Sequence, residues 1–255
     1  MIAWAFERHK HSSMRLTIIP GSRHVAGFAL FLVLCASTGQ ASEPASRRVP
    51  DTIAQRAEAC TVCHGKEGVS TNTGYFPRIA GKPAGYLFNQ LVNFREGRRN
   101  YQAMTHLVDH LSDAYLHEIA DYFAQLHLPY PPPQTHFAPE QILEHGKLLV
   151  LHGDGQRKIP ACAKCHGSAM TGVMPAFPGL LGLPRDYLVG QLGAWKSGQR
   201  NAPAPDCMAR IANQLTTEDV SAIATWLSAQ PIPSRAGAAT ASAEKRPLEC
   251  GSGQQ

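Results

Sequence analysis

Several patterns that mark other protein classes are missing from this sequence of 255 residues. No segment alternates apolar and polar residues as a half-buried β-strand does, and apolar residues recur at helical spacing instead. No glycine-rich nucleotide loop, catalytic triad or additional metal cluster is present, so nothing in the chain points to an organic substrate. No basic stripe of the kind that phosphate groups require is present either, which leaves nucleic-acid binding without support. The sequence therefore predicts an all-α fold.

Long hydrophobic runs are absent as well. The run near the N-terminus extends only from Val25 to Cys35, whereas a membrane-spanning helix needs about 20 apolar residues. Basic residues precede this run and small residues follow it, which predicts a signal peptide over residues 1–41. Export by this signal would place the mature protein in the periplasm. The alternatives are a retained membrane anchor, a start at Met14 and a lipid on Cys35.

Two copies of one five-residue signature stand out in the rest of the chain. Cys-x-x-Cys-His is the attachment motif of c-type haem: two thiols add to the vinyl groups of the haem, and the histidine becomes an axial ligand of its iron. All three side chains must face the same porphyrin, so their spacing is a chemical constraint. The two copies are Cys60-Thr61-Val62-Cys63-His64 and Cys162-Ala163-Lys164-Cys165-His166. They predict two covalently bound haem c groups.

Zinc binding and thiol redox chemistry are the alternatives for these cysteine pairs. A structural zinc site needs four ligands, which the two pairs could supply together. A thioredoxin-like motif would follow a strand in a βαβ unit, and no strand pattern precedes either pair. Neither alternative explains the histidine that follows the second cysteine in both copies, so we interpret the motifs as haem sites.

The surroundings of the motifs are repeated too. Residues 77–100 read PRIAGKPAGYLFNQLVNFREGRRN, and residues 178–201 read PGLLGLPRDYLVGQLGAWKSGQRN. The two segments align without a gap, which over this length indicates the duplication of a domain. We therefore expect a first domain over residues 42–127 and a second over residues 139–231.

Both halves follow one helical plan, with a connector between them and a tail at the end. Helices are expected over residues 52–59, 86–96, 139–151 and 187–197, and after the N-cap residues Ser112 and Thr216. Residues 128–138 contain consecutive prolines, which favour extended geometry and predict a semi-rigid linker. Residues 232–255 lack periodicity and are expected to form a disordered tail.

A haem held by one histidine needs a second axial ligand, and methionine is the ligand typical of electron-transfer cytochromes. The first half offers Met104 after its motif, and the second half offers Met170, Met174 and Met208. Met170 and Met174 follow the motif histidine closely. Met104 and Met208 each lie seven residues before a leucine that precedes the last helix. This shared position favours Met104 and Met208 as the iron ligands.

Histidine is the rival of methionine in the first half. His106 and His110 follow Met104 closely and could give bis-histidine ligation with a lower reduction potential. Their counterparts in the second half are Arg210 and Gln214, which cannot replace them. A duplicated site should keep its ligand, so the repeat favours methionine.

Two further contacts are expected. An axial histidine usually donates its other ring N–H to a carbonyl or a carboxylate. Pro77 and Pro178 follow the motif histidines by 13 and 12 residues, so their carbonyls are candidate acceptors, and a turn before the middle helix is the alternative role. Cys207 and Cys250 could form a disulfide in an oxidising compartment.

Together these features resemble the tandem di-haem class I cytochromes c of the cytochrome c4 type. The shared features are the two motifs, a Phe-Pro stretch ending in glycine, Tyr-Leu-x-x-Gln-Leu, and methionine before a Leu-(Ser/Thr) helix start, over about residues 52–230. The resemblance implies two tandem class I cytochrome c domains. It implies one haem held by Cys60, Cys63, His64 and Met104 and another held by Cys162, Cys165, His166 and Met208. Cys207 and the long polar tail depart from the family pattern.

The resemblance also implies an electron carrier of the respiratory chain, not an enzyme. Such a protein would take single electrons from a quinol-oxidising complex or a dehydrogenase and deliver them to a terminal oxidase, with at most loose membrane association. One alternative is a cytochrome subunit bound permanently to a membrane dehydrogenase or oxidase. The other is a di-haem peroxidase, which would need one haem with a displaceable ligand.

Overall fold

The computed structural model describes residues 50–70, 76–135, 137–234, 236–241 and 246–253. All of them belong to one compact unit of the chain, Val49–Gln255. The predicted signal peptide, residues 1–41, lies outside the described residues, so its presence stays a prediction. Within the described ranges, no helix is both long enough and apolar enough to cross a membrane.

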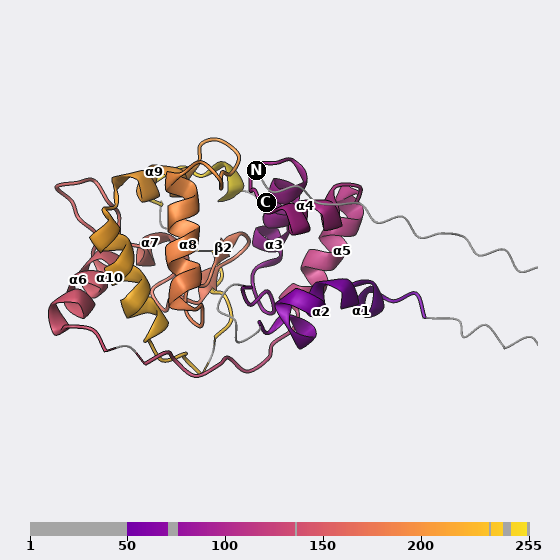
Figure 1. Ribbon diagram of the computed structural model, residues 1–255, viewed down its shortest axis with the longest axis horizontal. Helices are drawn as coiled ribbons and strands as arrows, with labels where there is room; N and C mark the ends of the chain where they lie inside the picture. The colour runs from indigo at the N-terminus through magenta and orange to yellow at the C-terminus, as the bar shows by residue number, and fades with distance from the viewer. Residues whose placement is uncertain (1–49, 71–75, 136, 235, 242–245, 254–255) are drawn as a thin grey trace, which may run out of the picture. The chain divides into compact units, whose positions relative to one another are not determined.

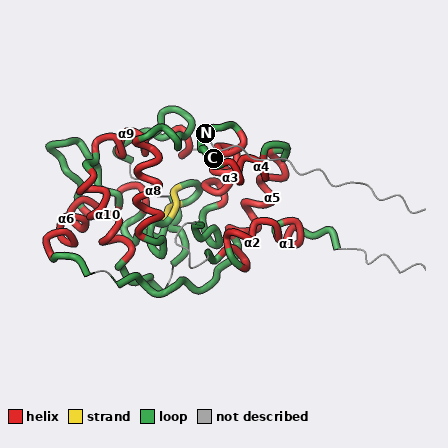
Figure 2. The backbone as a smooth tube through the Cα atoms, viewed as in Figure 1, coloured by secondary structure: helices red, strands yellow, loops and turns green. Residues whose placement is uncertain are grey.

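Helices dominate the described structure and form two consecutive groups (Figure 1, Figure 2). The first group comprises α1 (Ile53–Arg56), α2 (Glu58–His64), η1 (Lys66–Gly68), α3 (Ala84–Arg95), α4 (Gln102–Val108) and α5 (Asp113–Ala124). The second comprises α6 (Glu140–Leu151), α7 (Ala163–His166), β1 (Gly172–Val173), β2 (Phe177–Pro178), α8 (Arg185–Lys196), α9 (Cys207–Gln214), α10 (Thr217–Ser228) and η2 (Gly251–Gly253). The helical class of the fold is confirmed.

The antiparallel pair of β1 and β2 is a small addition to the predicted all-α fold. Gly172 pairs with Pro178, and Val173 pairs with Phe177. Each strand has only two residues, which is too short for alternating apolar and polar positions to appear in the sequence. The pairing matters for the site because it fixes the backbone of Pro178, one of the two candidate acceptors.

The middle helices confirm the repeat at the level of structure. α3 and α8 each follow a proline, Pro83 and Pro184. A glycine with positive φ lies just beyond each helix, at 72° for Gly97 and 73° for Gly198. Glycine adopts this left-handed backbone without steric cost, so the sequence itself encodes where these helices end. The predicted bounds differ from the observed ones by one or two residues.

The last helices have the N-caps that the sequence predicts. The Ser112 side chain accepts a hydrogen bond from the Tyr115 backbone N–H at 3.3 Å. The Thr216 side chain accepts one from the Asp219 backbone N–H at 3.1 Å. In return the Asp219 carboxylate accepts from the Thr216 backbone N–H at 2.8 Å, which completes a capping box. The start of α10 is therefore held from both directions.

Each group of helices encloses an apolar core of its own. In the first group α3 packs against α5, and in the second α10 packs against α6 and α8. Phe123 is buried in the first core and Leu227 in the second. Burying a side chain of this size contributes about 1.5–3 kcal/mol to stability. Two separate cores support the division into domains, whose bounds at 42–127 and 139–231 stay a prediction.

The predicted linker, residues 128–138, forms no helix or strand at its described positions and contacts both groups of helices. The Arg78 guanidinium donates to two consecutive linker carbonyls, at 2.6 and 2.9 Å. The Gln134 backbone N–H donates to the Ser228 carbonyl at the end of α10, at 2.9 Å. Hydrogen bonds to both groups therefore hold this segment in place.

The two halves also meet through reciprocal contacts between matched positions of the repeat. Arg99 donates to the Gln191 side chain at 2.7 Å, and Arg200 donates to the Gln90 side chain at 3.0 Å. The segments that carry the two arginines exchange two backbone hydrogen bonds, of 2.8 and 2.6 Å. Because each half offers the same residues to the other, the contact has local twofold symmetry.

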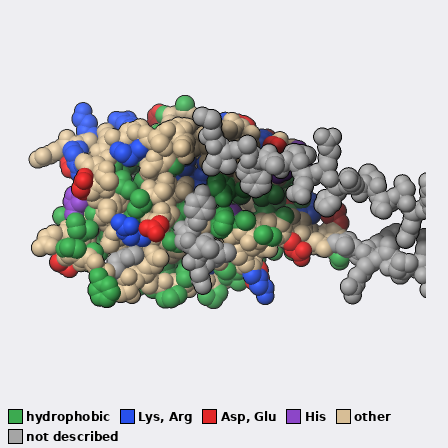
Figure 3. Space-filling view, viewed as in Figure 1, with side chains coloured by type: hydrophobic (Ala, Val, Ile, Leu, Met, Phe, Trp, Pro, Cys, Tyr) green, Lys and Arg blue, Asp and Glu red, His purple; other side chains and the backbone are tan. Residues whose placement is uncertain are grey.

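The surface carries charges of both signs and a few large apolar side chains. On the face in Figure 3, Lys and Arg side chains are scattered between Asp and Glu side chains. Among the described residues, Phe137 and Val62 are the most exposed large apolar side chains. Val62 lies between the two cysteines of the first motif, so an apolar surface adjoins the predicted attachment point of the first haem.

The described part of residues 232–255 is structured, which corrects the expectation of a disordered tail. Cys250 forms a disulfide with Cys207, so the pairing that the sequence allowed is confirmed. Ala239 pairs with Val173 of β1, and η2 adds a short turn near the end of the chain. The expectation of disorder followed from the composition of the tail, which has few apolar residues of its own. The contacts that order it come from other segments.

Asp219 links the capping box of α10 to α6 and to the loop after α6. Its side chain is 3% exposed, accepts from Arg157 Nη1 at 2.6 Å and lies 2.7 Å from His145 Nε2. Burial favours a raised pKa for Asp219. The hydrogen bonds from Arg157, from the Thr216 backbone and from His145 outweigh burial and lower the pKa to about 2. The ionised carboxylate of Asp219 therefore joins α6, the loop after α6 and the start of α10.

We predict that Asp219→Ala lowers the free energy of unfolding by about 2–3 kcal/mol, because it removes both the capping box of α10 and the acceptor of the Arg157 and His145 hydrogen bonds. The pKa of Asp219 in the folded state lies below the ordinary value of 3.8. The contribution of Asp219 is therefore complete above about pH 4 and is lost as the pH falls toward 2. Urea unfolding of the variant and of the wild type across this pH range measures both effects.

Asp186→Ala is the matched control, because the Asp186 side chain is 88% exposed. Its expected cost is below about 1 kcal/mol. Equal losses in the two variants would contradict the role assigned to Asp219.

Candidate haem sites

Helix α2 presents the first set of predicted attachment residues. Cys60 and Cys63 are three positions apart on this helix, so they share one face, and neither forms a disulfide. Both are partly exposed, as attachment to a haem requires. His64 ends the helix and is 8% exposed. At Gly65 the chain turns with φ of +77°, and a Cβ there would lie 2.3 Å from the Ser70 carbonyl oxygen, so this position requires glycine.

Helix α7 presents the second set in the same order. Cys162 directly precedes the helix, and Cys165 and His166 are its last two residues. Neither cysteine forms a disulfide, and His166 is 7% exposed. Gly167 follows with φ of +85°. The local geometry of the motif therefore repeats along with its sequence.

Each motif histidine makes the hydrogen bond to proline that the sequence predicts. His64 Nδ1 lies 2.9 Å from the Pro77 carbonyl oxygen, and His166 Nδ1 lies 2.8 Å from the Pro178 carbonyl oxygen. A carbonyl oxygen only accepts, so Nδ1 carries the proton and donates it. The Nε2 lone pair of each ring is then free to bind a metal.

Burial keeps both imidazoles neutral. It is the largest influence on the pKa of His64 and of His166, and it lowers both below their ordinary value against the opposing effect of the proline carbonyls. Nearby positive charges lower them further, Arg99 in the case of His64 and Lys82 in the case of His166. A neutral imidazole with a free Nε2 is the form that binds iron.

The surroundings of the cysteines argue against zinc binding and thiol redox chemistry. Burial raises the pKa of Cys60 and of Cys165 and raises the pKa of Cys162 to about 12. Redox-active thiols have lowered pKa values instead. Within the part of the chain that the structure describes, no three His, Cys, Asp or Glu residues are grouped to hold a metal ion. Paired thiols beside one neutral imidazole fit a covalently attached haem.

The predicted methionine ligands occupy equivalent short helices. Met104 lies in α4 and Met208 in α9, and each helix directly precedes the last helix of its half. Both side chains are partly buried. Met170 is 3% exposed and packs in the second core, while Met174 is exposed at the surface. These placements favour Met104 and Met208, whose bonds to iron stay a prediction.

The rival histidines of the first half are both exposed. His106 lines an open surface hollow together with Gln102 and Asp109. His110 Nδ1 lies 2.7 Å from the Asp109 carboxylate. Neither histidine is held by packing against the first core, so their surroundings give no support for ligation by histidine.

A buried lysine lies beside the second site and was not predicted from the sequence. Lys82 is 4% exposed, and its Nζ donates to the Gly179 carbonyl at 2.8 Å. Burial, and to a smaller degree the charge of Arg78, lowers the pKa of Lys82 to about 7. The available signal was a mismatch in the repeat, because Leu183 stands at the position equivalent to Lys82.

Several curated proteins resemble this chain over most of its length, among them the two described next, although no protein-family model matches it. The thiosulfate dehydrogenase electron acceptor of Thiomonas intermedia is 37% identical over 179 residues, which cover 69% of this chain and 80% of that protein. Cytochrome c4 of Pseudomonas aeruginosa is 32% identical over 174 residues, which cover 68% of this chain and 84% of that protein.

A solved structure agrees with these similarities. Reduced recombinant cytochrome c4 from Pseudomonas stutzeri superposes with a TM-score of 0.61 at 27% sequence identity, covering 69% of this chain and 96% of that chain. The match is longer than either half of the repeat, so it takes in both motif-bearing halves. This chain belongs to the cytochrome c4 family of di-haem electron carriers, and it carries two covalently bound haem c groups.

Proposed function

We propose that this protein carries single electrons in the periplasm from a quinol-oxidising complex or a dehydrogenase to a terminal oxidase. The periplasmic location rests on the predicted signal peptide, residues 1–41, and on the attachment of haem c outside the bacterial cytoplasm. In this proposal two thioether bonds and two axial ligands hold each haem. The ligand sets are Cys60, Cys63, His64 and Met104 for one haem and Cys162, Cys165, His166 and Met208 for the other.

The matched hydrogen bond from each motif histidine to a proline carbonyl carries this proposal. It holds the imidazole ring in one orientation and one tautomer, with Nε2 directed away from the bonded carbonyl. Burial keeps water from both rings. When bound, the haem supplies one-electron exchange at its iron. A His/Met pair leaves no coordination position open for a substrate, which supports a carrier over a di-haem peroxidase.

The contact between the halves supports electron exchange within the protein. The charge of Arg99, which binds Gln191 in the second half, reaches His64 and lowers its pKa. The charge of Lys82, which belongs to the first half, reaches His166 in the same way. Both motif histidines are therefore near residues that join the two halves.

The name of a relative supports a dehydrogenase as the donor. The similar protein from Thiomonas intermedia is named as an electron acceptor of thiosulfate dehydrogenase. We extend this role to the present chain, which makes a thiosulfate dehydrogenase its proposed donor. A cytochrome subunit bound permanently to its dehydrogenase would have the same two sites and would differ in the lifetime of the complex.

We predict that Met104→His lowers the reduction potential of one haem and leaves the other unchanged, because imidazole favours the oxidised iron more than a thioether does. A spectroelectrochemical titration measures both potentials, and the pyridine haemochrome spectrum counts covalent haems in the same sample. Met174→His is the matched control, since Met174 is exposed and outside the proposed ligand set. Two unchanged potentials in Met104→His would remove Met104 from that set.

We also predict that a purified thiosulfate dehydrogenase reduces this protein when thiosulfate is added, and that thiosulfate alone does not. Stopped-flow absorbance of the haem bands measures the rate, with a quinol-oxidising complex and its quinol tested in parallel. Reduction by the quinol-oxidising complex alone would reject thiosulfate dehydrogenase as the donor. Stable co-elution with the dehydrogenase would favour the permanent subunit over a free carrier.

A further inference from the structure

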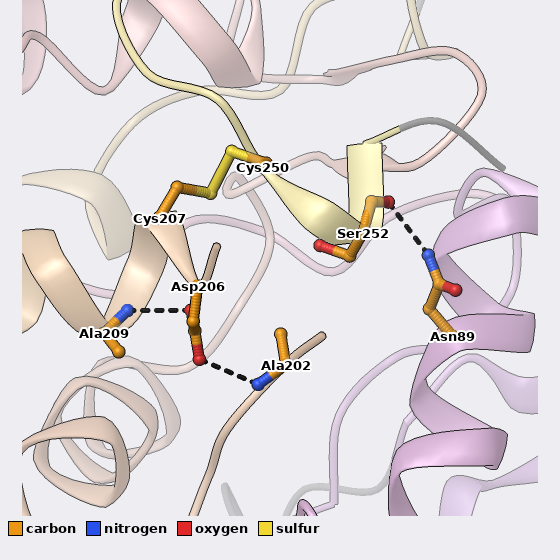
Figure 4. Close-up of a disulfide and its surroundings, with 7 residues drawn as sticks. All are labelled: Asn89, Ala202, Asp206, Cys207, Ala209, Cys250 and Ser252. Atoms are coloured by element: carbon orange, nitrogen blue, oxygen red, sulfur yellow. Dashed lines mark hydrogen bonds between the residues drawn. A yellow bond between two sulfur atoms is a disulfide. The ribbon is translucent and has the colours of Figure 1, made fainter. Parts of the chain in front are cut away.

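Residues 250–253 lie against the loop that leads into α9 and are joined to it at Cys207 (Figure 4). Cys250 is bonded to Cys207, which is the first residue of α9 and the immediate neighbour of Met208. We refer to residues 250–253 as the tail clamp. All of its residues are described in the structure.

The tail clamp fits closely against this loop. The Gly251 backbone N–H donates to the Pro205 carbonyl at 3.0 Å, and a Cβ on Gly251 would lie 2.4 Å from another carbonyl oxygen of the loop. Asp206 closes the loop itself: its carboxylate accepts from the backbone N–H groups of Ala209 at 2.9 Å and Ala202 at 2.7 Å. The disulfide therefore attaches the tail clamp to a loop that is already closed by hydrogen bonds.

The tail clamp also contacts the first half and the strand β2. Asn89 of α3 is 5% exposed and donates from its side chain to the Ser252 carbonyl at 3.0 Å. A Cβ on Gly253 would lie 3.0 Å from the ring of Phe177 in β2. The four residues thus join α3, the loop before α9 and the strand that carries the acceptor of His166.

The repeat shows that only the second site has a cysteine beside its predicted methionine ligand. Ala103 stands beside Met104 at the position equivalent to Cys207, so the first site has no corresponding cysteine. A disulfide restricts the relative motion of the segments that it joins. We propose that the tail clamp is a positioning element that keeps Met208 on the iron of the second haem in both oxidation states. This inference rests on the proposed function, in which Met208 is an axial ligand.

The experiment removes both cysteines, since a lone thiol at Cys207 could itself bind iron. The double variant Cys207→Ala/Cys250→Ala is expected to keep two covalent haems, to lose part of the absorption band of methionine-ligated ferric haem, and to bind carbon monoxide at one of its two reduced haems. The wild type is expected to keep the full band and to bind no carbon monoxide.

A second measurement uses the folded wild-type protein, so its result does not depend on whether the double variant folds. The disulfide of the folded wild type is opened with a phosphine reductant, its thiols are alkylated, and the same carbon monoxide titration is made. A full methionine band with no carbon monoxide binding in both samples would overturn the role of the tail clamp. A wild type without the methionine band at either haem would overturn the proposed ligands instead.

Lys82 joins the two halves next to the second site. This residue belongs to the first half, and its Nζ donates at 2.8 Å to the Gly179 carbonyl in the second half. Gly179 directly follows Pro178, whose carbonyl accepts from His166. One residue along the backbone therefore separates the carbonyl that binds the lysine from the carbonyl that binds the motif histidine.

The fold does not need a lysine at this position. Leu183 occupies the equivalent place in the repeat and is buried in the second core. A buried ammonium group is costly unless its charge is used or compensated. The geometry shows where that charge lies, because Lys82 Nζ binds the carbonyl of Gly179, the residue that directly follows the Pro178 acceptor of His166.

We infer that Lys82 raises the reduction potential of the haem at His166. A positive charge near an iron favours the state that holds one more electron. Because the first half supplies this charge, the potential of the second haem depends on the contact between the halves. The inference rests on the proposed function only in taking His166 as an iron ligand.

The experiment replaces Lys82 by the residue of the repeat. Lys82→Leu is expected to lower the reduction potential of the His166 haem. The electron equilibrium between the two haems should shift at least tenfold, which corresponds to about 59 mV for one electron. The potentials are measured one pH unit below the lowered pKa of Lys82, so that the wild-type side chain is charged. The Met104→His variant identifies which of the two waves belongs to the first haem.

Two further variants separate charge from packing. Lys82→Arg keeps the charge and is expected to keep the potential. Lys147→Leu removes a lysine that is 46% exposed, and both potentials should stay unchanged. Equal potentials in Lys82→Leu and the wild type would overturn the inference, as would an equal drop in Lys147→Leu. Absence of a covalent haem at Cys162 and Cys165 in the wild type would overturn the proposed function.

Discussion

The hydrogen bond between a buried histidine ring and a proline carbonyl is the interaction on which both sites depend. An imidazole that is less than a tenth exposed must have a partner for its N–H, or its burial is costly. Proline supplies a carbonyl acceptor and brings no backbone N–H that would itself need a partner at the site. The sharp glycine turn after each motif sends the chain away from the histidine, and the proline returns to it 12 or 13 residues later. The tautomer that can bind iron follows from this single contact.

The two halves share this interaction and differ in what surrounds it. The first site lies on a longer motif helix, α2, and has an alanine beside its predicted methionine. The second site has a disulfide next to Met208, a two-stranded sheet that fixes Pro178, and a lysine from the other half. The two attachment motifs are therefore alike, and among the described residues the second site has additional contacts from a disulfide, a strand pair and a lysine of the other half.

Much of the fold could be predicted from the sequence because its signals are local. A serine or threonine N-cap accepts a hydrogen bond from a backbone N–H three residues later. The starts of α5 and α10 can therefore be predicted from a few neighbouring residues. The ends of α3 and α8 depend on one glycine each. The order of the tail was not predicted because it depends on contacts with residues far away in the sequence. Its order depends on Cys207 and Asn89, and the latter lies 163 residues before its partner Ser252.

By itself, the sequence predicted which residues attach the haems, because the chemistry requires two thiols and an imidazole within five positions. It also indicated Pro77 and Pro178 as candidate acceptors of the two histidines, and the structure confirms both hydrogen bonds. Only the tertiary structure decided that Arg99 binds Gln191 across the halves and that Lys82 reaches the second site. Contacts between residues so far apart in the chain depend on how the two halves pack, and no spacing along the sequence encodes that packing.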